Sequence, residues 1–219
     1  MATKKSTLTK DKIVSMFMND TLENNEKPKS VYHFAKANGL TESEFYNFFG
    51  GLEGVEKEIF STFLAKTIEL LDKDKDYEYY DMKSKMLSFY FTFFELLSAN
   101  RSYVVLSLKE NKNPLQGLMQ LSSLRNGFKE FVSGIISDEY RLKQEKFQEI
   151  QEKALQESAW FQLMMTLKFW LDDSSASFEK TDLFIEKSVK ASFELMNTTP
   201  LESLIDFGKF LFKEKIQHN

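Results

Sequence analysis

The stretch SVYHFAKANGLTESEFYNFFGGLEGV, residues 30–55, is the part of the sequence that decides the expected fold. It reads as two short helices joined by a tight turn and followed by a longer helix. Asn38-Gly39 is a stop signal for the first helix, because both residues tolerate the left-handed backbone conformation. Thr41 and Glu44 have the spacing of a capping box at the start of the second helix. A helix-turn-helix of this size can place its second helix in the DNA major groove.

This segment resembles the DNA-binding domain of the tetracycline-repressor (TetR) family of bacterial transcription regulators. The residues that carry the resemblance are Ser30, Phe34-Ala35, Ala37 to Thr41, Phe45-Tyr46, Phe49, Glu53 and Val55. Residues 169–189, FWLDDSSASFEKTDLFIEKSV, are similar to the C-terminal part of such regulators. The resemblance implies an all-α protein with a three-helix DNA-binding domain at residues 1–54. Residues 55–219 would then form a helical ligand-binding and dimerisation domain.

The composition favours helices throughout. The 219 residues include only three prolines and eight glycines, and no strand-like alternation occurs. The charged segment 72–81 is the most visible boundary between helices. From apolar spacing and stop signals, helices are expected at residues 10–22, 55–71, 86–97, 101–110, 115–137, 139–172, 178–197 and 201–216.

The resemblance also implies a double-stranded DNA operator as partner. The side chains expected to face the groove or the phosphates are Lys29, Ser30, Thr41, Glu42, Ser43, Tyr46 and Asn47. Residues 1–55 contain seven lysines and seven acidic residues, so the motif lacks the basic balance typical of DNA-binding modules. Leu52 stands where the family usually has a lysine that contacts a phosphate. Lysines of the N-terminal arm, such as Lys4 and Lys5, are candidates to compensate.

Aromatic and methionine side chains are abundant in the remaining helices, with 22 Phe, 8 Tyr and 9 Met in the whole chain. They indicate that any effector is an apolar small molecule. The family comparison implies an effector pocket in this region. The residues expected to line it are Phe89, Tyr90, Phe93, Phe94, Tyr103, Phe128, Phe131, Trp160 and Met164. For each of these residues the alternative is an ordinary place in the core.

Residues 160–171 carry two apolar stripes where a helix of a small domain needs one, so the second stripe invites a partner. In the TetR family the last long helices of two chains form a four-helix dimer interface, which implies a homodimer here. The interface residues expected are Phe161, Met165, Phe169, Phe178, Ile185, Val189 and Phe193.

Catalysis is not expected. The two histidines, His33 and His218, have no metal-ligand spacing to a partner, and cysteine is absent. No catalytic residue, metal site or cofactor is therefore predicted. The longest apolar run, residues 86–94, is far shorter than the ~20 residues that span a bilayer. The N-terminus lacks the apolar region of a signal peptide, and a cytoplasmic location is expected.

Three hypotheses of function remain open from the sequence. The first is a ligand-responsive transcription regulator, expected to be a repressor. The second is a protein of the same fold that has lost DNA binding and binds a lipid or another hydrophobic molecule, which Glu42, Glu44 and Leu52 favour. The third is a regulator that acts through protein partners. The charge of the motif surface distinguishes the first two.

Overall fold

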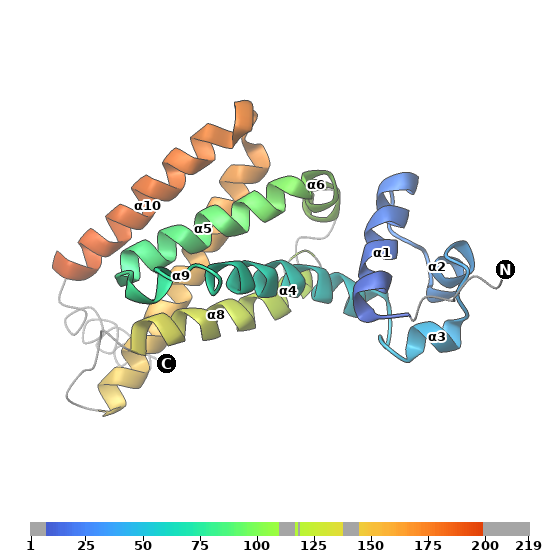
Figure 1. The fold of residues 1–219 in the computed structure, drawn as a ribbon, viewed down its shortest axis with the longest axis horizontal. Coiled ribbons are helices and arrows are strands. Elements are labelled where there is room, and N and C mark those ends of the chain that lie inside the picture. Colours follow the sequence, from blue (N-terminus) through green and yellow to red (C-terminus); the bar gives the residue numbers. More distant parts are fainter. Residues whose placement is uncertain (1–7, 110–116, 118, 138–144, 199–219) are drawn as a thin grey trace, which may run out of the picture. The chain divides into compact units, whose positions relative to one another are not determined.

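The computed structural model describes residues 8–109, 117, 119–137 and 145–198, and these residues form helices joined by turns (Figure 1). No strand occurs within these ranges, which confirms the expected all-α fold. The α-helices are α1 (Lys10–Asn24), α2 (Val31–Ala37), α3 (Glu42–Tyr46), α4 (Leu52–Leu71), α5 (Met82–Ala99), α6 (Arg101–Lys109), α8 (Ser122–Ser137), α9 (Glu145–Asp172) and α10 (Glu179–Thr198). Two 3₁₀ helices, Tyr77–Tyr79 and Ala176–Phe178, lie in connections.

Several expected helices differ from the observed ones in their bounds. The helix expected at 55–71 starts at Leu52, and the one expected at 86–97 extends over Met82–Ala99. The helix expected at 115–137 is interrupted by a turn at Leu121, and α8 starts directly after it. The helix expected to start at Phe178 starts at Glu179, because Ser177 and Phe178 have φ angles of 53° and 60°, which an α-helix does not accommodate. The helix expected at 201–216 lies outside the described residues.

The described residues pack as two units, one from within residues 1–69 and 93–127 and the other from within residues 70–92 and 128–219. In the first unit, α2 packs on α3 and α1 packs on α6. Fully buried phenylalanines join the first three helices: the rings of Phe17 and Phe34 are 5.9 Å apart, and those of Phe34 and Phe45 are 5.8 Å apart. Burying each such ring contributes about 1.5–3 kcal/mol, so these contacts orient α3 against α1 and α2.

The second unit is built on the pairing of α9 with α10. Trp170 of α9 and Ile185 of α10 are both fully buried. Nearer the start of α9, the ring of Trp160 lies 6.3 Å from that of Phe128, which in turn lies 5.1 Å from that of Phe89. The second unit therefore has an aromatic core that links the described parts of α5, α8 and α9 within it.

Candidate functional site

The helix-turn-helix is stabilised by side-chain caps at both of its short helices. Ser30 accepts a hydrogen bond from the His33 backbone N–H and caps α2. Thr41 and Glu44 form the capping box expected from the sequence, in which the Thr41 N–H and hydroxyl both donate to Glu44 Oε2 at 2.9 Å. Gly39 adopts a φ of 67° in the turn between them, where a side chain would be strained. These local bonds set the direction of α3.

The helix α3 is buried on one side and exposed on the other. Phe45 is completely buried, whereas Tyr46 keeps 53% of its surface exposed. Of the residues expected to contact DNA, Ser30 is half-buried and the remaining six are exposed: Lys29, Thr41, Glu42, Ser43, Tyr46 and Asn47. The structure therefore leaves these six side chains accessible to a partner.

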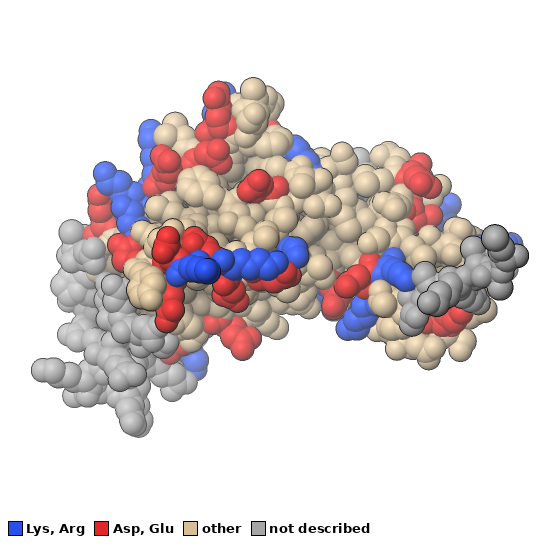
Figure 2. All heavy atoms as spheres, viewed as in Figure 1, with Lys and Arg blue, Asp and Glu red and all other residues tan. Residues whose placement is uncertain are grey.

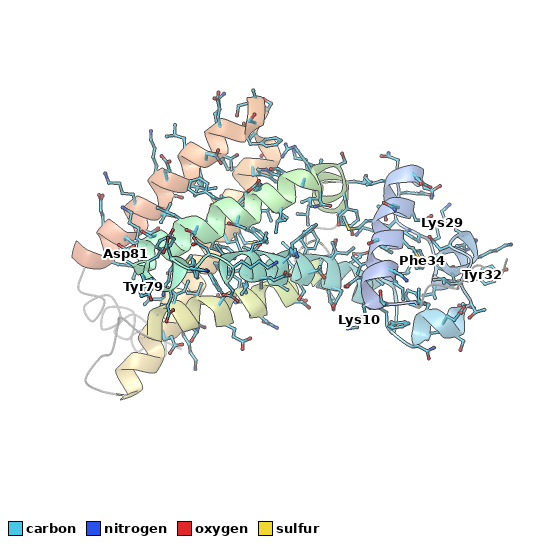
Figure 3. The ribbon with its side chains drawn as sticks, viewed as in Figure 1. Lys10, Lys29, Tyr32, Phe34, Tyr79 and Asp81 are labelled. Carbon is cyan, nitrogen blue, oxygen red and sulfur yellow. The ribbon has the colours of Figure 1, made fainter. Side chains whose placement is uncertain are left out.

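Tyr32 is an exposed residue of the helix-turn-helix that the predicted set of DNA-contacting residues did not include. It is 52% exposed on the outer side of α2, opposite Phe34, which points toward α1 (Figure 3). The Lys36 Nζ lies 5.8 Å from the centre of the Tyr32 ring. The sequence contained a signal for this, because Tyr32 lies off the apolar stripe of its helix. An aromatic ring at such a position does not pack into the core.

The lysines of the motif are largely engaged with acidic side chains. Lys27 Nζ lies 2.9 Å from Glu56 Oε2, Lys29 Nζ lies 3.5 Å from Glu26 Oε1, and Lys10 Nζ lies 3.9 Å from Glu58 Oε1. Over the motif in Figure 2, acidic and basic side chains of the described residues are interspersed. Lys4 and Lys5 lie outside the described residues.

The residues expected to line an effector pocket lie inside the two units. Six of them are buried, namely Phe89, Tyr90, Phe93, Phe94, Tyr103 and Phe128, and three are half-buried, namely Phe131, Trp160 and Met164. Burial raises the pKa of Tyr90 and Tyr103 far above the ordinary phenol value, so both phenols are neutral. Their role in binding a ligand stays a prediction.

The second unit contains an apolar cavity of about 210 Å³, and none of those nine residues is among the described residues that line it. Phe193, expected at the dimer interface, does line it. The described lining residues are Met82 and Met86 of α5, Val132, Ile135 and Ile136 of α8, Leu155, Ser158, Ala159 and Gln162 of α9, and Ser192, Phe193, Leu195 and Met196 of α10. Sequence periodicity does not show which apolar side chains leave a space between them.

An exposed apolar surface runs along α9 and α10. Phe161, Met165 and Phe169 are 65%, 42% and 37% exposed, as expected for an unpartnered stripe. The Phe169 ring stacks on that of Phe184 at 4.6 Å, and Leu183 is 48% exposed beside it. We call these five residues the α9–α10 face.

The other expected interface residues are less accessible. Ile185 and Val189 are buried within the chain, where they pack α10 onto α9, and Phe178 and Phe193 are half-buried. No group of three or more His, Cys, Asp or Glu side chains that suits a metal ion occurs in the described part of the chain. Within the same part, no helix combines the length and apolar character that crossing a membrane requires.

The sequence profile of the family described as "Tetracyclin repressor-like, C-terminal domain" matches residues 85–211, more than half of the chain. The protein belongs to the tetracyclin repressor-like family. This membership agrees with the resemblance of residues 30–55 and makes the protein a transcription regulator. Comparison with curated proteins gives no match.

A solved structure with a similar fold is that of the fatty acid degradation regulator FadR from Bacillus halodurans. The TM-score is 0.54 at 18% sequence identity, and the match covers 84% of this chain and 95% of the other. At this level of identity, the likeness between the two proteins is a likeness of fold alone. The family is one of regulators, which points to a regulatory role and not to an enzymatic one.

Proposed function

We propose that this tetracyclin repressor-like protein is a cytoplasmic, homodimeric repressor that binds an operator through residues 1–54 and releases it when an apolar effector binds in residues 55–219. The observation that carries the proposal is the presentation of α3. Its inner side is anchored by the buried Phe45, and its start is held by the Thr41–Glu44 capping box. Its outer side, with Ser43 and Tyr46, is left exposed.

Glu44 is less of an obstacle to DNA binding than the sequence suggests. Its carboxylate accepts hydrogen bonds from the Thr41 backbone and hydroxyl, so it turns back onto the start of α3. A negative charge there is favoured by the helix dipole. Glu42 is then the acidic residue of α3 that remains exposed to a phosphate.

A second candidate function, binding of a hydrophobic molecule without DNA, is favoured by the engagement of the lysines. Lys10, Lys27 and Lys29 each lie within 4 Å of an acidic side chain. A lysine that keeps its acidic neighbour releases fewer counterions from DNA, and its contribution to binding is smaller.

Dimerisation is proposed through the α9–α10 face. Five large apolar side chains on one surface are more than scattered exposure on a monomer accounts for. A second copy that covers this face would bring α9 and α10 of the two chains together, as the family comparison implies. The two copies of α3 would then meet half-sites about one DNA turn, or a multiple of it, apart.

Fluorescence anisotropy with fragments of the gene's upstream DNA, at about 50 and 200 mM salt, tests the DNA-binding part of the proposal. We expect saturable binding of one fragment that weakens steeply with salt. Lys29→Ala should weaken binding and reduce the slope of log K against log salt by about 1. Lys66→Ala is the matched control, because Lys66 is also exposed and ion-paired but lies far along α4.

Absence of binding at about 50 mM salt by the folded dimer would reject the operator proposal and leave the hydrophobic-ligand function standing. Equal effects of Lys29→Ala and Lys66→Ala would reject the assignment of the motif surface, even if the protein binds DNA.

A further inference from the structure

The cavity of about 210 Å³ and a shallow surface groove share a wall. The groove is lined by Phe161, Met165 and Phe184 of the α9–α10 face, together with polar residues. The residues that line both the cavity and the groove are Ser158, Gln162 and Ser192. A single layer of side chains therefore separates the cavity from the exposed face.

Hydrogen bonds of Gln162 join α9 to α10 within this wall. Ser192 Oγ donates to Gln162 Oε1 at 2.9 Å, and Gln162 Nε2 donates to Ser188 Oγ at 3.4 Å. Ser188 in turn donates to the backbone oxygen of Ile185 at 3.3 Å. We call the set Gln162, Ser188 and Ser192 the Gln162 latch. Both ends of the Gln162 amide are thus used to hold α10 at its present position on α9.

The lining of the cavity indicates the chemistry of an occupant. All of its described lining residues are uncharged, and the polar ones belong to the shared wall. A carboxylate or ammonium group in this cavity would lose its hydration without gaining a counter-charge, which is costly. A neutral hydroxyl or carbonyl can instead exchange hydrogen bonds with the Gln162 amide.

The volume limits the size of the occupant. An apolar cavity of about 150 Å³ accommodates benzene, and drug-sized ligands need about 300 Å³ or more. The cavity of about 210 Å³ lies between these values. Scaling from benzene gives room for roughly eight non-hydrogen atoms within the cavity itself. Leu195 lines the cavity and is also 61% exposed, so this side chain lies at the opening.

We propose that the cavity binds a small, neutral, mainly apolar molecule with one hydrogen-bonding group, and that this group opens the Gln162 latch and weakens the dimer. The inference rests on the proposed dimerisation through the α9–α10 face. A ligand that takes a hydrogen bond from Gln162 competes with Ser192 or Ser188 for it. Once the latch opens, α10 can shift on α9, and Phe184 no longer holds its place against Phe169.

The probes are n-octanol and octanoate, which share a chain length and differ in charge. Isothermal titration calorimetry on the full chain should show binding of n-octanol, with octanoate at least tenfold weaker. Ala159→Leu fills the cavity without touching the latch and should weaken n-octanol binding at least tenfold. Its circular dichroism spectrum and its melting temperature show whether it is folded.

Sedimentation equilibrium then measures coupling to the dimer. Saturating n-octanol should raise the dimer dissociation constant about fivefold or more. Because a dimer carries two sites, linkage then makes each monomer bind n-octanol more tightly by the square root of that factor, about twofold or more. Gln162→Met keeps the side-chain volume and removes the latch. This variant should still bind n-octanol, but n-octanol should no longer change its dimer dissociation constant.

The inference is overturned if folded wild-type protein does not bind n-octanol, if octanoate binds as tightly, or if saturating n-octanol leaves dimerisation unchanged. Failure of the proposed function is seen separately, as absence of DNA binding or of a dimer without any ligand. Calorimetry with n-octanol and Ala159→Leu tests the cavity in either case.

Discussion

Asp173 follows the last residue of α9, and its carboxylate accepts four hydrogen bonds. The backbone N–H and hydroxyl of Ser175 donate to Oδ1, and the same groups of Thr181 donate to Oδ2, at 2.7–3.0 Å. Thr181 lies in the first turn of α10, so Asp173 caps this helix from outside it. Asp173 therefore has a structural role at the turn between α9 and α10.

Asp173→Ala should lower the free energy of unfolding by about 1–2 kcal/mol at pH 7, the range for loss of a helix cap. Burial alone raises the pKa of this carboxyl, but hydrogen bonds to its charged form outweigh burial and lower the pKa from 3.8 to about 2. Because the pKa is lower in the folded protein, the ionised Asp173 stabilises the fold fully at pH values above the pKa of the unfolded state. This stabilisation is lost as the pH falls toward 2. Urea unfolding of both proteins at pH 7, 4 and 3 checks this, and a difference that grows as the pH falls would contradict it.

The two acidic residues of α3 should behave differently when neutralised. Glu42→Gln removes an exposed charge and should tighten DNA binding with little change in melting temperature. Glu44→Gln weakens the capping box and should lower the melting temperature, since both Thr41 donors lose a charged acceptor. Anisotropy and thermal melting of the two variants measure this. Equal melting temperatures for the two variants would mean that the charge of Glu44 contributes nothing to the capping box.

At the scale of elements, α8 approaches α4 closely at one glycine. A Cβ built on Gly127 would lie 2.7 Å from Leu64 Cδ2, and Leu64 is buried. Gly134 of the same helix has open space around the equivalent position. A side chain at position 127 would therefore require the buried Leu64 side chain to move.

Gly127→Val should destabilise the protein by about 1–3 kcal/mol, the range for overpacking a core. Gly134→Val makes the same change at an open position of α8 and should be close to neutral. Urea unfolding of the two variants measures the difference. If both lose the same stability, the cause is helix propensity and the packing of α8 on α4 is not limited by Gly127.

Local signals made some elements predictable and left others undetermined. The capping box, the Gly39 turn and the start of α1 follow from residues within a few positions of one another, and the sequence predicted them. The delayed start of α10 depends on the backbone angles at Ser177 and Phe178, for which the sequence contains no glycine signal. Local sequence signals therefore predict that a helix exists better than they predict where it begins after a strained turn.

The candidate site was less predictable from the sequence than the helices, because it depends on tertiary packing. Helical spacing placed Ile185 and Phe161 on apolar stripes, but Ile185 is buried in its own chain and Phe161 is exposed. Periodicity identifies an apolar side of a helix and does not say which neighbour covers it. The cavity has the same origin, because it is a space left where side chains of four helices meet, and no single helix encodes it.

For the whole molecule, the proposed dimer through the α9–α10 face would tie DNA binding to assembly. One copy of α3 would contact one half-site, so a monomer would give up the gain in affinity that comes from linking two contacts. Phe161 is the most exposed side chain of the face, at 65%. A negative charge at this position would be buried without a partner in a dimer that covers the face.

Phe161→Glu should therefore raise the dimer dissociation constant about 100-fold, as expected when an aromatic interface anchor worth over 2 kcal/mol is lost, and it should weaken operator binding in parallel. Tyr79→Glu is the control, because Tyr79 is an exposed aromatic residue in the connection before α5, at 83% exposure and outside the face. Light scattering gives the mass of both variants, and anisotropy gives their DNA affinity. A dimeric Phe161→Glu protein would place the dimer interface elsewhere. A monomeric variant that binds the operator as tightly as wild type would separate DNA recognition from assembly, because α3 would then act without its second copy.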